Sequence, residues 1–353
     1  MNKEVKVGLI GYGLGGRVFH APIIESIVGL KLYKVYETRP ENVKHLKEKY
    51  PSVTVVSKVD EILTDSDINL IVIATPNKVH YELAKRALEN GKDVVVEKPF
   101  TVTSEEADKL ITLSKETNRV LSVHHNRRWD SDFKTVEKVI KNNLVGDIIE
   151  LEIHYDRFRA ELTNNWRDEN EVGSGMLYDL GSHLIDQAQC LLGLPKEVFA
   201  NLQIQRQGGR AIDYFEVILK YPKVTVTLKS GMLIREPGPH YVIHGTKGSF
   251  VKYGMDGQEE ALKRDLIPKD IEAWGVEPEE LWGKINTEVN GVHIIGKVES
   301  ETGDYRDFYR NVYKAVLREE PLAVTPDQAR NTIRIIELAE QSNLLRQWIK
   351  FEK

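Results

Sequence analysis

Apolar and polar positions follow two different patterns along the chain. In the first third, short apolar runs separated by helix-length segments predict strands at 5–10, 31–36, 69–74, 93–96 and 120–123. The run at 69–74 is nearly all apolar, which is typical of a strand covered on both faces. Strands that alternate with helices predict an α/β protein whose N-terminal part is a Rossmann-type, doubly wound parallel sheet.

Helix signals occupy the spaces between these strands. A glycine-rich turn leads into a helix predicted around 15–28, and Asn90-Gly91 ends a later helix. Thr103, with Glu106 three residues further on, forms a capping box that opens the next helix.

The pattern changes after residue 123. Helices are predicted at 130–142, 177–192 and 326–347. Strands are predicted at 149–155, 198–205, 214–221, 224–233 and 241–244. Turn signals between them indicate an α+β domain with an open antiparallel sheet. The acidic, weakly periodic segment 254–292 predicts a long surface loop with short elements. We therefore expect one domain at 1–123 and a second at 124–353.

Composition narrows the class of protein. The 353 residues suit two domains. With 49 Lys and Arg against 54 Asp and Glu, the net charge of −5 and the lack of a basic stripe argue against nucleic-acid binding. No apolar stretch reaches the ~18 residues of a membrane helix, and the first residues hold no export signal, so we expect a cytoplasmic protein without a membrane partner. Cys190 is the only cysteine, which excludes an intramolecular disulfide and a cysteine-built metal site.

The glycine-rich turn carries the first functional signal. Gly11, Gly13 and Gly16 fit G-x-G-x-x-G, with Leu14 inside the turn, directly after a predicted strand and before a helix. In that context the glycines permit a tight turn, close approach of a pyrophosphate and close helix–sheet packing. A glycine-rich turn without a ligand is the alternative.

The end of the second strand bears on the cofactor. Glu37 lies 21 residues after Gly16, where an acidic side chain accepts hydrogen bonds from an adenosine ribose and repels a 2′-phosphate. We therefore expect NAD. Arg39, two residues later, is able to accept a 2′-phosphate and leaves NADP open.

Two further strand ends supply candidate ligand contacts, because ligands of open parallel sheets bind at the carboxyl ends of strands. After the strand at 69–74 the candidates are Thr75, Pro76, Asn77 and His80. Asn77 also suits a simple helix cap, and His80 an ordinary surface position. After the strand at 93–96 the candidates are Glu97 and Lys98, and Lys98 would project toward the cofactor.

Asp179 and His183 lie four residues apart in a predicted helix, so they share one face. Both interrupt an apolar segment, and buried polar groups need a partner or a purpose. An acid–base pair, a metal-ligand pair and a surface ion pair all fit this spacing. No further ligands stand at metal-binding spacing, so we expect no metal.

The segment His124-His125-Asn126-Arg127-Arg128-Trp129 lies where the first domain is predicted to end. Ligand pockets are common at domain junctions, so Arg127 and Trp129 are candidates for substrate binding. A hinge with hydrogen-bonded polar groups is the alternative.

Together these motifs resemble the glucose–fructose oxidoreductase / inositol dehydrogenase family (Gfo/Idh/MocA) over nearly the whole chain. The resemblance rests on the turn at 11–16, on Glu97-Lys98-Pro99, and on Asp179 four residues before His183. Segments 16–22, 125–130 and 178–183 are most similar to its NADP-dependent scyllo-inositol dehydrogenase branch.

The resemblance implies a dinucleotide domain at 1–123 and a substrate-binding domain at 124–353 whose sheet forms homodimers or homotetramers. It implies an NAD(P)-dependent enzyme that moves a hydride between the cofactor and a secondary alcohol of a cyclic polyol or sugar. It also implies a cis Lys98–Pro99 bond, and catalytic roles for Lys98, Asp179 and His183, of which Asp179 and His183 also contact the substrate. Two other functions found with this fold stay open: a non-catalytic dinucleotide sensor, and reduction of a C=C bond as in biliverdin reductases.

Overall fold

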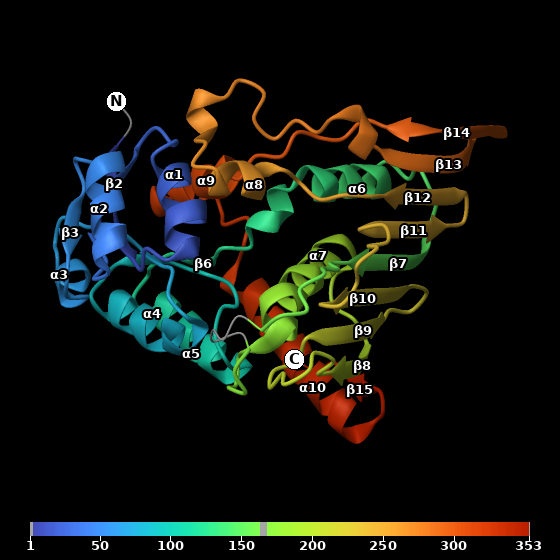
Figure 1. Ribbon diagram of the computed structural model, residues 1–353, viewed down its shortest axis with the longest axis horizontal. Helices are drawn as coiled ribbons and strands as arrows, with labels where there is room; N and C mark the ends of the chain where they lie inside the picture. Colours follow the sequence, from blue (N-terminus) through green and yellow to red (C-terminus); the bar gives the residue numbers. More distant parts are fainter. Residues whose placement is uncertain (1–2, 163–167, 353) are drawn as a thin grey trace. The chain divides into compact units, whose positions relative to one another are not determined.

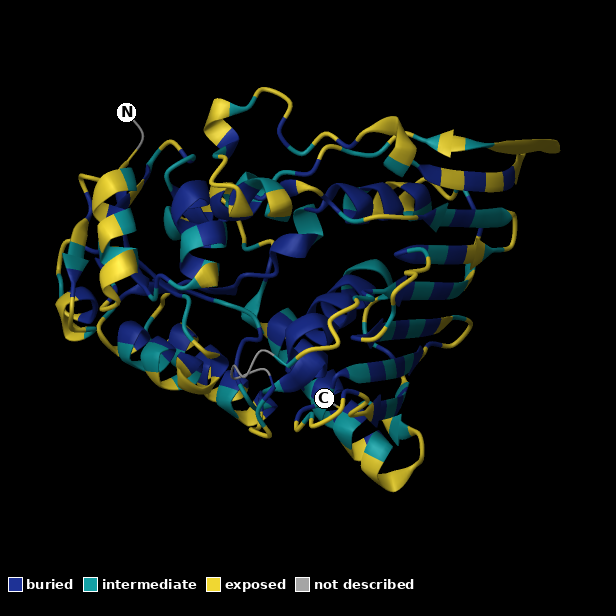
Figure 2. Cartoon of the chain, viewed as in Figure 1, coloured by how far each residue is buried: buried dark blue, intermediate teal, exposed yellow. Residues whose placement is uncertain are grey.

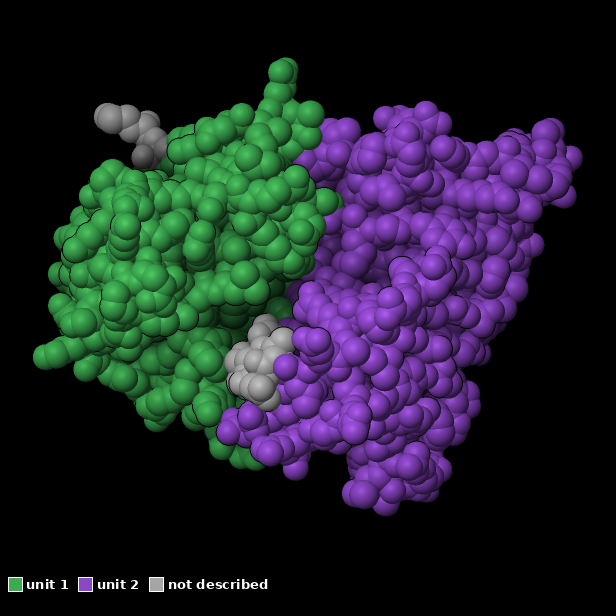
Figure 3. Space-filling view, in the orientation of Figure 1, with its two compact units in different colours: residues 1–126, 257–274, 304–330 green, residues 127–256, 275–303, 331–353 purple. Residues whose placement is uncertain are grey.

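The computed structural model describes residues 3–162 and 168–352, and the chain divides into two compact units (Figure 3). Unit 1 comprises Met1–Asn126, Gly257–Trp274 and Asp304–Arg330. Unit 2 comprises Arg127–Asp256, Gly275–Gly303 and Asn331–Lys353. The sequence suggested a single division after residue 123, whereas two later segments belong with the first unit. A single cut cannot describe them, because their contacts are with residues far away in the sequence.

Unit 1 is built on a parallel sheet with the strand order β3-β2-β1-β4-β5-β6 among the described residues. Its strands are β1 (Val5–Ile10), β2 (Leu30–Tyr36), β3 (Thr54–Val56), β4 (Leu70–Ile73), β5 (Asp93–Val96) and β6 (Leu121–Val123). Each neighbouring pair is parallel. The order reverses between β1 and β4, which opens a crevice at the carboxyl ends of the strands.

Helices cover both faces of this sheet. They are α1 (Ala21–Ile24), α2 (Pro40–Lys49), α3 (Asp60–Leu63), α4 (His80–Glu89), α5 (Ser104–Glu116), α8 (Gln258–Lys263) and α9 (Arg306–Val316). Helices α4 and α5 lie together on one side, and α1 and α9 pack on the other (Figure 1). The residues of β4 and β5 are fully buried between these layers, as their apolar composition requires.

Unit 2 is built on a nine-stranded sheet with the order β14-β13-β12-β11-β7-β10-β9-β8-β15 in its described part. The strands are β7 (Ile148–His154), β8 (Glu197–Gln203), β9 (Tyr214–Lys220), β10 (Thr225–Gly231), β11 (Tyr241–Gly245), β12 (Gly248–Lys252), β13 (Gly283–Val289), β14 (Val292–Val298) and β15 (Ile349–Lys350). β7 and β10 pair in parallel, so the sheet is mixed rather than purely antiparallel.

The helices of unit 2 pack on one face of its sheet. They include α6 (Ser131–Lys141), α7 (Ser182–Leu192) and α10 (Pro326–Leu345), the last of which crosses the boundary between the units. Along β8 and β9, buried positions alternate with partly exposed ones, so one face packs inward (Figure 2).

Two local predictions differ from the structure. The helix expected around 15–28 is a π-helix (Gly15–His20) followed by the short α1, and the chain leaves the helix after Ile24. The segment 254–292, predicted as a long surface loop with short elements, contains the short helix α8 as well as β13, which pairs with β14 in an antiparallel hairpin that the sequence did not predict. β13 alternates buried and exposed positions, but β14 carries Val292, Ile294 and Ile295 at exposed positions and so lacks the alternation that would have revealed the hairpin. Across residues 3–162 and 168–352, no helix is both long and apolar enough to cross a membrane.

Candidate active site

The glycine-rich turn follows β1 as predicted. Gly11 adopts a φ of +100°, and an added Cβ would lie 2.5 Å from the Ala74 carbonyl oxygen at the end of β4. At Gly16, an added Cβ would collide with the Gly11 carbonyl. Both glycines are therefore required by the fold, for the left-handed backbone and for the close packing of the helix.

Gly13 is different, because no contact among residues 3–162 and 168–352 requires a glycine there. The single atom near an added Cβ is a guanidinium nitrogen of Arg39 at 3.6 Å, an ordinary contact with a mobile group. The missing side chain leaves open backbone at the start of the π-helix, where the Arg17 amide bonds the Gly13 carbonyl at 2.9 Å. Next to it, Leu14 is 59% exposed. The turn thus fits a dinucleotide pyrophosphate.

Glu37 lies at the end of β2 with its carboxylate almost fully buried. Oε1 accepts the amides of Thr38 and Arg39 at 2.8 and 2.9 Å, and Oε2 accepts the Asn42 amide at 2.8 Å. Burial alone would raise the pKa of Glu37, but these hydrogen bonds and those from the Arg39 side chain lower it to about 2. The side chain is ionised and held in place.

Arg39 completes this arrangement. Its Nε and Nη2 donate to the two oxygens of Glu37 at 3.0 and 2.6 Å, while about half of the side chain stays exposed beside Gly13. The turn after β2 therefore presents a neutralised acid–base pair rather than a lone carboxylate.

The buried His80 side chain contacts the loop after β4. This buried ring lies 2.9 Å from the Thr75 carbonyl through Nε2 and 2.9 Å from the Pro99 carbonyl through Nδ1. It therefore links the loops after β4 and β5. Asn77 is buried and Pro76 is exposed, so this loop offers both an interior amide and an outer edge. His80 therefore holds the two loops in position relative to each other.

The loop after β5 carries Glu97 and Lys98, both partly buried. The Lys98–Pro99 bond is cis, which confirms the expectation from the resemblance. The Lys98 amide donates to Glu97 Oε2 at 2.8 Å. Glu97 Oε1 lies 3.7 Å from the position of an added Cβ on Gly15, so this carboxylate lies under the glycine-rich turn.

Two histidines hold Glu97. Nε2 of His20 and Nδ1 of His124 lie 2.9 and 3.0 Å from the same Glu97 oxygen, Oε1. The other ring nitrogen of His20 lies 2.5 Å from the Tyr309 hydroxyl on α9. Burial alone would raise the pKa of Glu97, but His124 and His20 hold it well below its usual range. Burial lowers the pKa of His20 to about 4.

In unit 2, Asp179 and His183 occupy one continuous helical segment. Asp179 lies in a π-helix (Leu177–Gly181) that runs directly into α7, and His183 is the second residue of α7. The two side chains are 8% and 5% exposed in this largely buried stretch. Both are therefore buried polar residues in a helical segment that is otherwise largely apolar.

The first turns of α7 are fastened to the segment that sequence analysis singled out. Arg128 makes a two-pronged ion pair with Asp186, with nitrogen–oxygen distances of 2.8 and 2.6 Å. The Gln187 side chain donates to the Arg127 carbonyl at 3.3 Å. Asp186 and Gln187 follow His183 by three and four residues, so these contacts fix the helix that carries it.

Arg127 is held within the same unit. Its guanidinium donates to Asp130 at 3.2 Å and to the Tyr155 hydroxyl at 2.7 Å. Arg157 donates to the same hydroxyl at 2.9 Å and lies over the Tyr155 ring. Trp129 is half-buried. Tyr155 and Arg157, at the end of β7, are polar neighbours of Arg127 that the sequence pattern did not single out, because their partners are distant in sequence.

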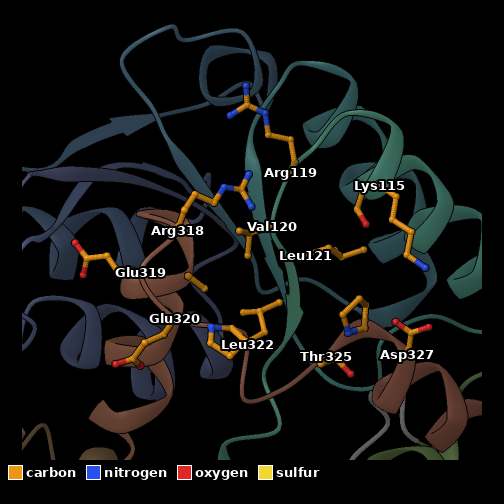
Figure 4. A pocket seen from close by; sticks show the side chains of 14 residues that line it. Lys115, Arg119, Val120, Leu121, Arg318, Glu319, Glu320, Leu322, Thr325 and Asp327 are labelled. Atoms are coloured by element: carbon orange, nitrogen blue, oxygen red, sulfur yellow. The ribbon is translucent and has the colours of Figure 1, made fainter.

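Unit 1 also has an open hollow of about 590 Å³ around the start of β6 (Figure 4). Its charged lining residues are Lys115, Arg119, Arg318, Glu319, Glu320 and Asp327. The hollow lies at the amino ends of the strands, away from the glycine-rich turn, and it mixes both charge signs. It is therefore not the cofactor site.

The sequence placed the candidate cofactor residues correctly on loops after β1, β2, β4 and β5 of one sheet. It missed His20 and Tyr309 as parts of the Glu97 cluster. A histidine in the apolar segment Val18-Phe19-His20-Ala21-Pro22 was the available signal, because a buried polar group needs a partner. No local pattern connects it to Tyr309.

A parallel sheet of this order with this loop chemistry defines a nicotinamide-dinucleotide-dependent oxidoreductase. Residues 5–125 match the sequence profile of the oxidoreductase family with an NAD-binding Rossmann fold, and residues 137–351 match that family's C-terminal alpha/beta domain. The chain belongs to the Gfo/Idh/MocA oxidoreductase family. It is an oxidoreductase with an NAD-binding Rossmann domain.

Full-length relatives support this assignment. The chain is 39% identical to scyllo-inositol 2-dehydrogenase (NADP(+)) of Bacillus subtilis, over 99% of this chain and 96% of that protein. It is 25% identical to myo-inositol 2-dehydrogenase of Thermotoga maritima, over 72% of this chain and 74% of that protein.

Among solved structures, an oxidoreductase of Bacillus subtilis superposes with a TM-score of 0.95 at 38% identity, covering 100% of this chain and 99% of that chain. An oxidoreductase of Bacteroides fragilis superposes with a TM-score of 0.90 at 43% identity, covering 99% and 100%.

Proposed function

We propose that the protein oxidises a secondary alcohol of a cyclic polyol, an inositol or a closely similar sugar, and reduces the corresponding ketone in the reverse direction. One observation carries the proposal: the 39% identity, over 99% of the chain, to a protein named for its action on scyllo-inositol. The chemistry of Lys98, Asp179 and His183 supports it, because alcohol oxidation needs a proton acceptor and a group that stabilises negative charge on oxygen.

Bound NAD(P)⁺ supplies the hydride acceptor. His183 takes the proton of the substrate hydroxyl as that carbon becomes a ketone, and it returns the proton in the reverse direction. Lys98 supplies a donor that stabilises the negative charge developing on an alcohol oxygen. Asp179, about one helical turn before His183, orients the substrate or the imidazole. Arg127 and Trp129 contribute polar and aromatic contacts to the substrate.

We propose NAD as the preferred cofactor. The carboxylate of Glu37 is ionised and fixed at the end of β2, where its oxygens suit the hydroxyls of a ribose diol, while its ion pair with Arg39 weakens its repulsion of a 2′-phosphate. Gly11, Gly13, Leu14 and Gly16 hold the pyrophosphate, and Thr75, Pro76 and Asn77 border the nicotinamide half. Arg39 leaves room for NADP, because its exposed guanidinium is able to turn outward from Glu37.

The test is a panel of inositols and sugars, each assayed with NAD⁺ and NADP⁺ by absorbance of the reduced cofactor. Oxidation of an inositol that disappears in His183→Ala, and persists in the matched control His244→Ala on the exposed end of β11, supports the proposal. Cofactor binding without turnover of any substrate would favour a sensor. Reduction of biliverdin alone would favour a C=C reductase.

We further propose a cytoplasmic homodimer or homotetramer assembled through the sheet of unit 2. The partly exposed side chains that alternate along β8 and β9 support this assembly, because a broad uncovered sheet face suits contact with a second copy. Light scattering after size exclusion measures the mass, and a monomer at micromolar concentration would contradict it.

A further inference from the structure

Glu97 is the central residue of a buried hydrogen-bonded cluster that the proposed mechanism does not use. The cluster comprises His20 after the glycine-rich turn, Glu97 after β5, His124 after β6 and Tyr309 on α9. His20 and Tyr309 are fully buried and His124 is 1% exposed. Four separate segments of unit 1 thus converge on one carboxylate.

The positions of the protons in this cluster follow from which atoms can only accept hydrogen bonds. An ionised carboxylate only accepts hydrogen bonds, so His20 must donate from Nε2 and His124 from Nδ1 to Glu97 Oε1. A neutral His20 then has a bare Nδ1, which accepts the Tyr309 hydroxyl at 2.5 Å. The result is a directed chain from Tyr309 through His20 to Glu97 that leaves one net negative charge on the carboxylate.

The orientation of Glu97 matters because of its two neighbours. Its Oε2 accepts the amide of Lys98, the proposed catalytic lysine, at 2.8 Å. Its Oε1 lies under Gly15 of the dinucleotide turn. The Glu97 side chain is 13% exposed, and a carboxylate is an acceptor suited to the hydroxyl or amide donors of a nicotinamide riboside.

We propose that His20, His124 and Tyr309 are positioning residues that hold the Glu97 carboxylate, and with it the Lys98 backbone, in the orientation that binds the nicotinamide half of the cofactor. This inference rests on the cofactor site of the proposed function but not on its substrate. The same three groups, His20, Glu97 and His124, have ligand atoms within 4.8 Å of one another, as a metal site would. The direct nitrogen–oxygen distances of 2.9 and 3.0 Å, and the occupied Nδ1 of His20, favour hydrogen bonds.

The test measures the dissociation constants of NADH and NADPH by fluorescence from pH 4 to 9, without any substrate. In His20→Leu, Glu97 loses one donor, so we expect the acid limb of cofactor binding to move up by about one to two pH units. His20→Gln retains an amide donor and is expected to restore most of the original pH profile. Tyr309→Phe removes one hydroxyl and is expected to weaken binding about two- to tenfold.

Tyr313→Phe is the matched control. Tyr313 lies one turn further along α9 and donates to the Lys3 carbonyl at 2.9 Å, away from Glu97. We expect this variant to keep the original affinity and pH profile. Equal effects of Tyr309→Phe and Tyr313→Phe, or an unchanged pH profile in His20→Leu, would overturn the proposal. So would release of one equivalent of metal by EDTA together with weaker binding. Because binding alone is measured, failure to find a polyol substrate leaves this test intact.

Discussion

Arg39 closes over the carboxylate of Glu37 with two hydrogen bonds, Nε to Oε1 at 3.0 Å and Nη2 to Oε2 at 2.6 Å. The pair places a fixed negative charge and a partly exposed positive charge next to each other beside Gly13. Cofactor choice at this site therefore depends on which member faces the 2′ position of the adenosine ribose.

Glu37→Gln is expected to improve NADPH binding relative to NADH by about tenfold, because a neutral amide no longer repels the 2′-phosphate. Arg39→Ala should act in the opposite direction, since it removes the cation that a phosphate needs. Dissociation constants for both cofactors provide the measurement, and Lys44→Ala, an exposed cation on α2, is the control. If the unaltered protein uses NADP more than tenfold better than NAD, Arg39 rather than Glu37 governs the site.

Alanine substitutions at Gly11 and Gly13 are expected to affect different properties of the protein. Gly11→Ala places a side chain on a backbone with φ of +100° and against the Ala74 carbonyl, so it should lower the free energy of unfolding by about 1–3 kcal/mol. Gly13→Ala meets no close atom and should change stability by less than about 0.5 kcal/mol.

Gly13→Ala should nonetheless weaken cofactor binding, because its methyl group fills the open backbone of the turn. Denaturant unfolding and fluorescence titration separate the two effects. A Gly13→Ala variant that binds cofactor normally would contradict the role assigned to this glycine.

The His183→Ala and Lys98→Ala variants are expected to fold normally and to lose most of their catalytic activity. Loss of a general base typically costs about 10²–10⁴ in rate, and loss of a donor to a developing oxyanion about 10²–10³. We therefore expect kcat to fall by these factors. A His183→Ala variant with nearly unchanged kcat on the substrate that the panel identifies would remove His183 from the mechanism.

Asp179→Asn should cost less than either of these changes, about tenfold in kcat, if Asp179 only orients His183 or the substrate. The amide keeps the shape of the side chain and removes its charge. Steady-state kinetics on the same substrate make the comparison, and a loss as large as that of His183→Ala would instead give Asp179 a direct part in proton transfer.

Acid is expected to destabilise the protein partly through His20. Burial lowers the pKa of His20 from 6.5 to about 4, so below pH 6.5 the unfolded chain binds a proton that the folded chain does not. The contribution of His20 to the free energy of unfolding is therefore complete above pH 6.5, and it falls by about 1.4 kcal/mol per pH unit down to pH 4.

His20→Gln lacks this titration, so its urea midpoint should decline less steeply between pH 6.5 and 4.5. His293→Gln removes an exposed histidine from β14 and is expected to keep the original slope. Parallel declines in the unaltered protein and His20→Gln would contradict the prediction.

Periodicity and turn chemistry alone predicted the parallel sheet, the glycine-rich turn and the loops after β2, β4 and β5, because these features depend on neighbours within a few residues. The same local signals found the helix that carries Asp179 and His183. They did not find the β13–β14 hairpin, because β14 exposes apolar side chains and so lacks the alternation of a half-buried strand.

Only the tertiary structure determined which partners the buried polar side chains bond. The bond between His20 and Tyr309 joins residues 289 positions apart, and it exists because α9 returns to the first unit. A sequence specifies which polar groups must be buried, whereas their partners are chosen by the packing of distant segments, since each buried charge needs a donor within hydrogen-bond distance.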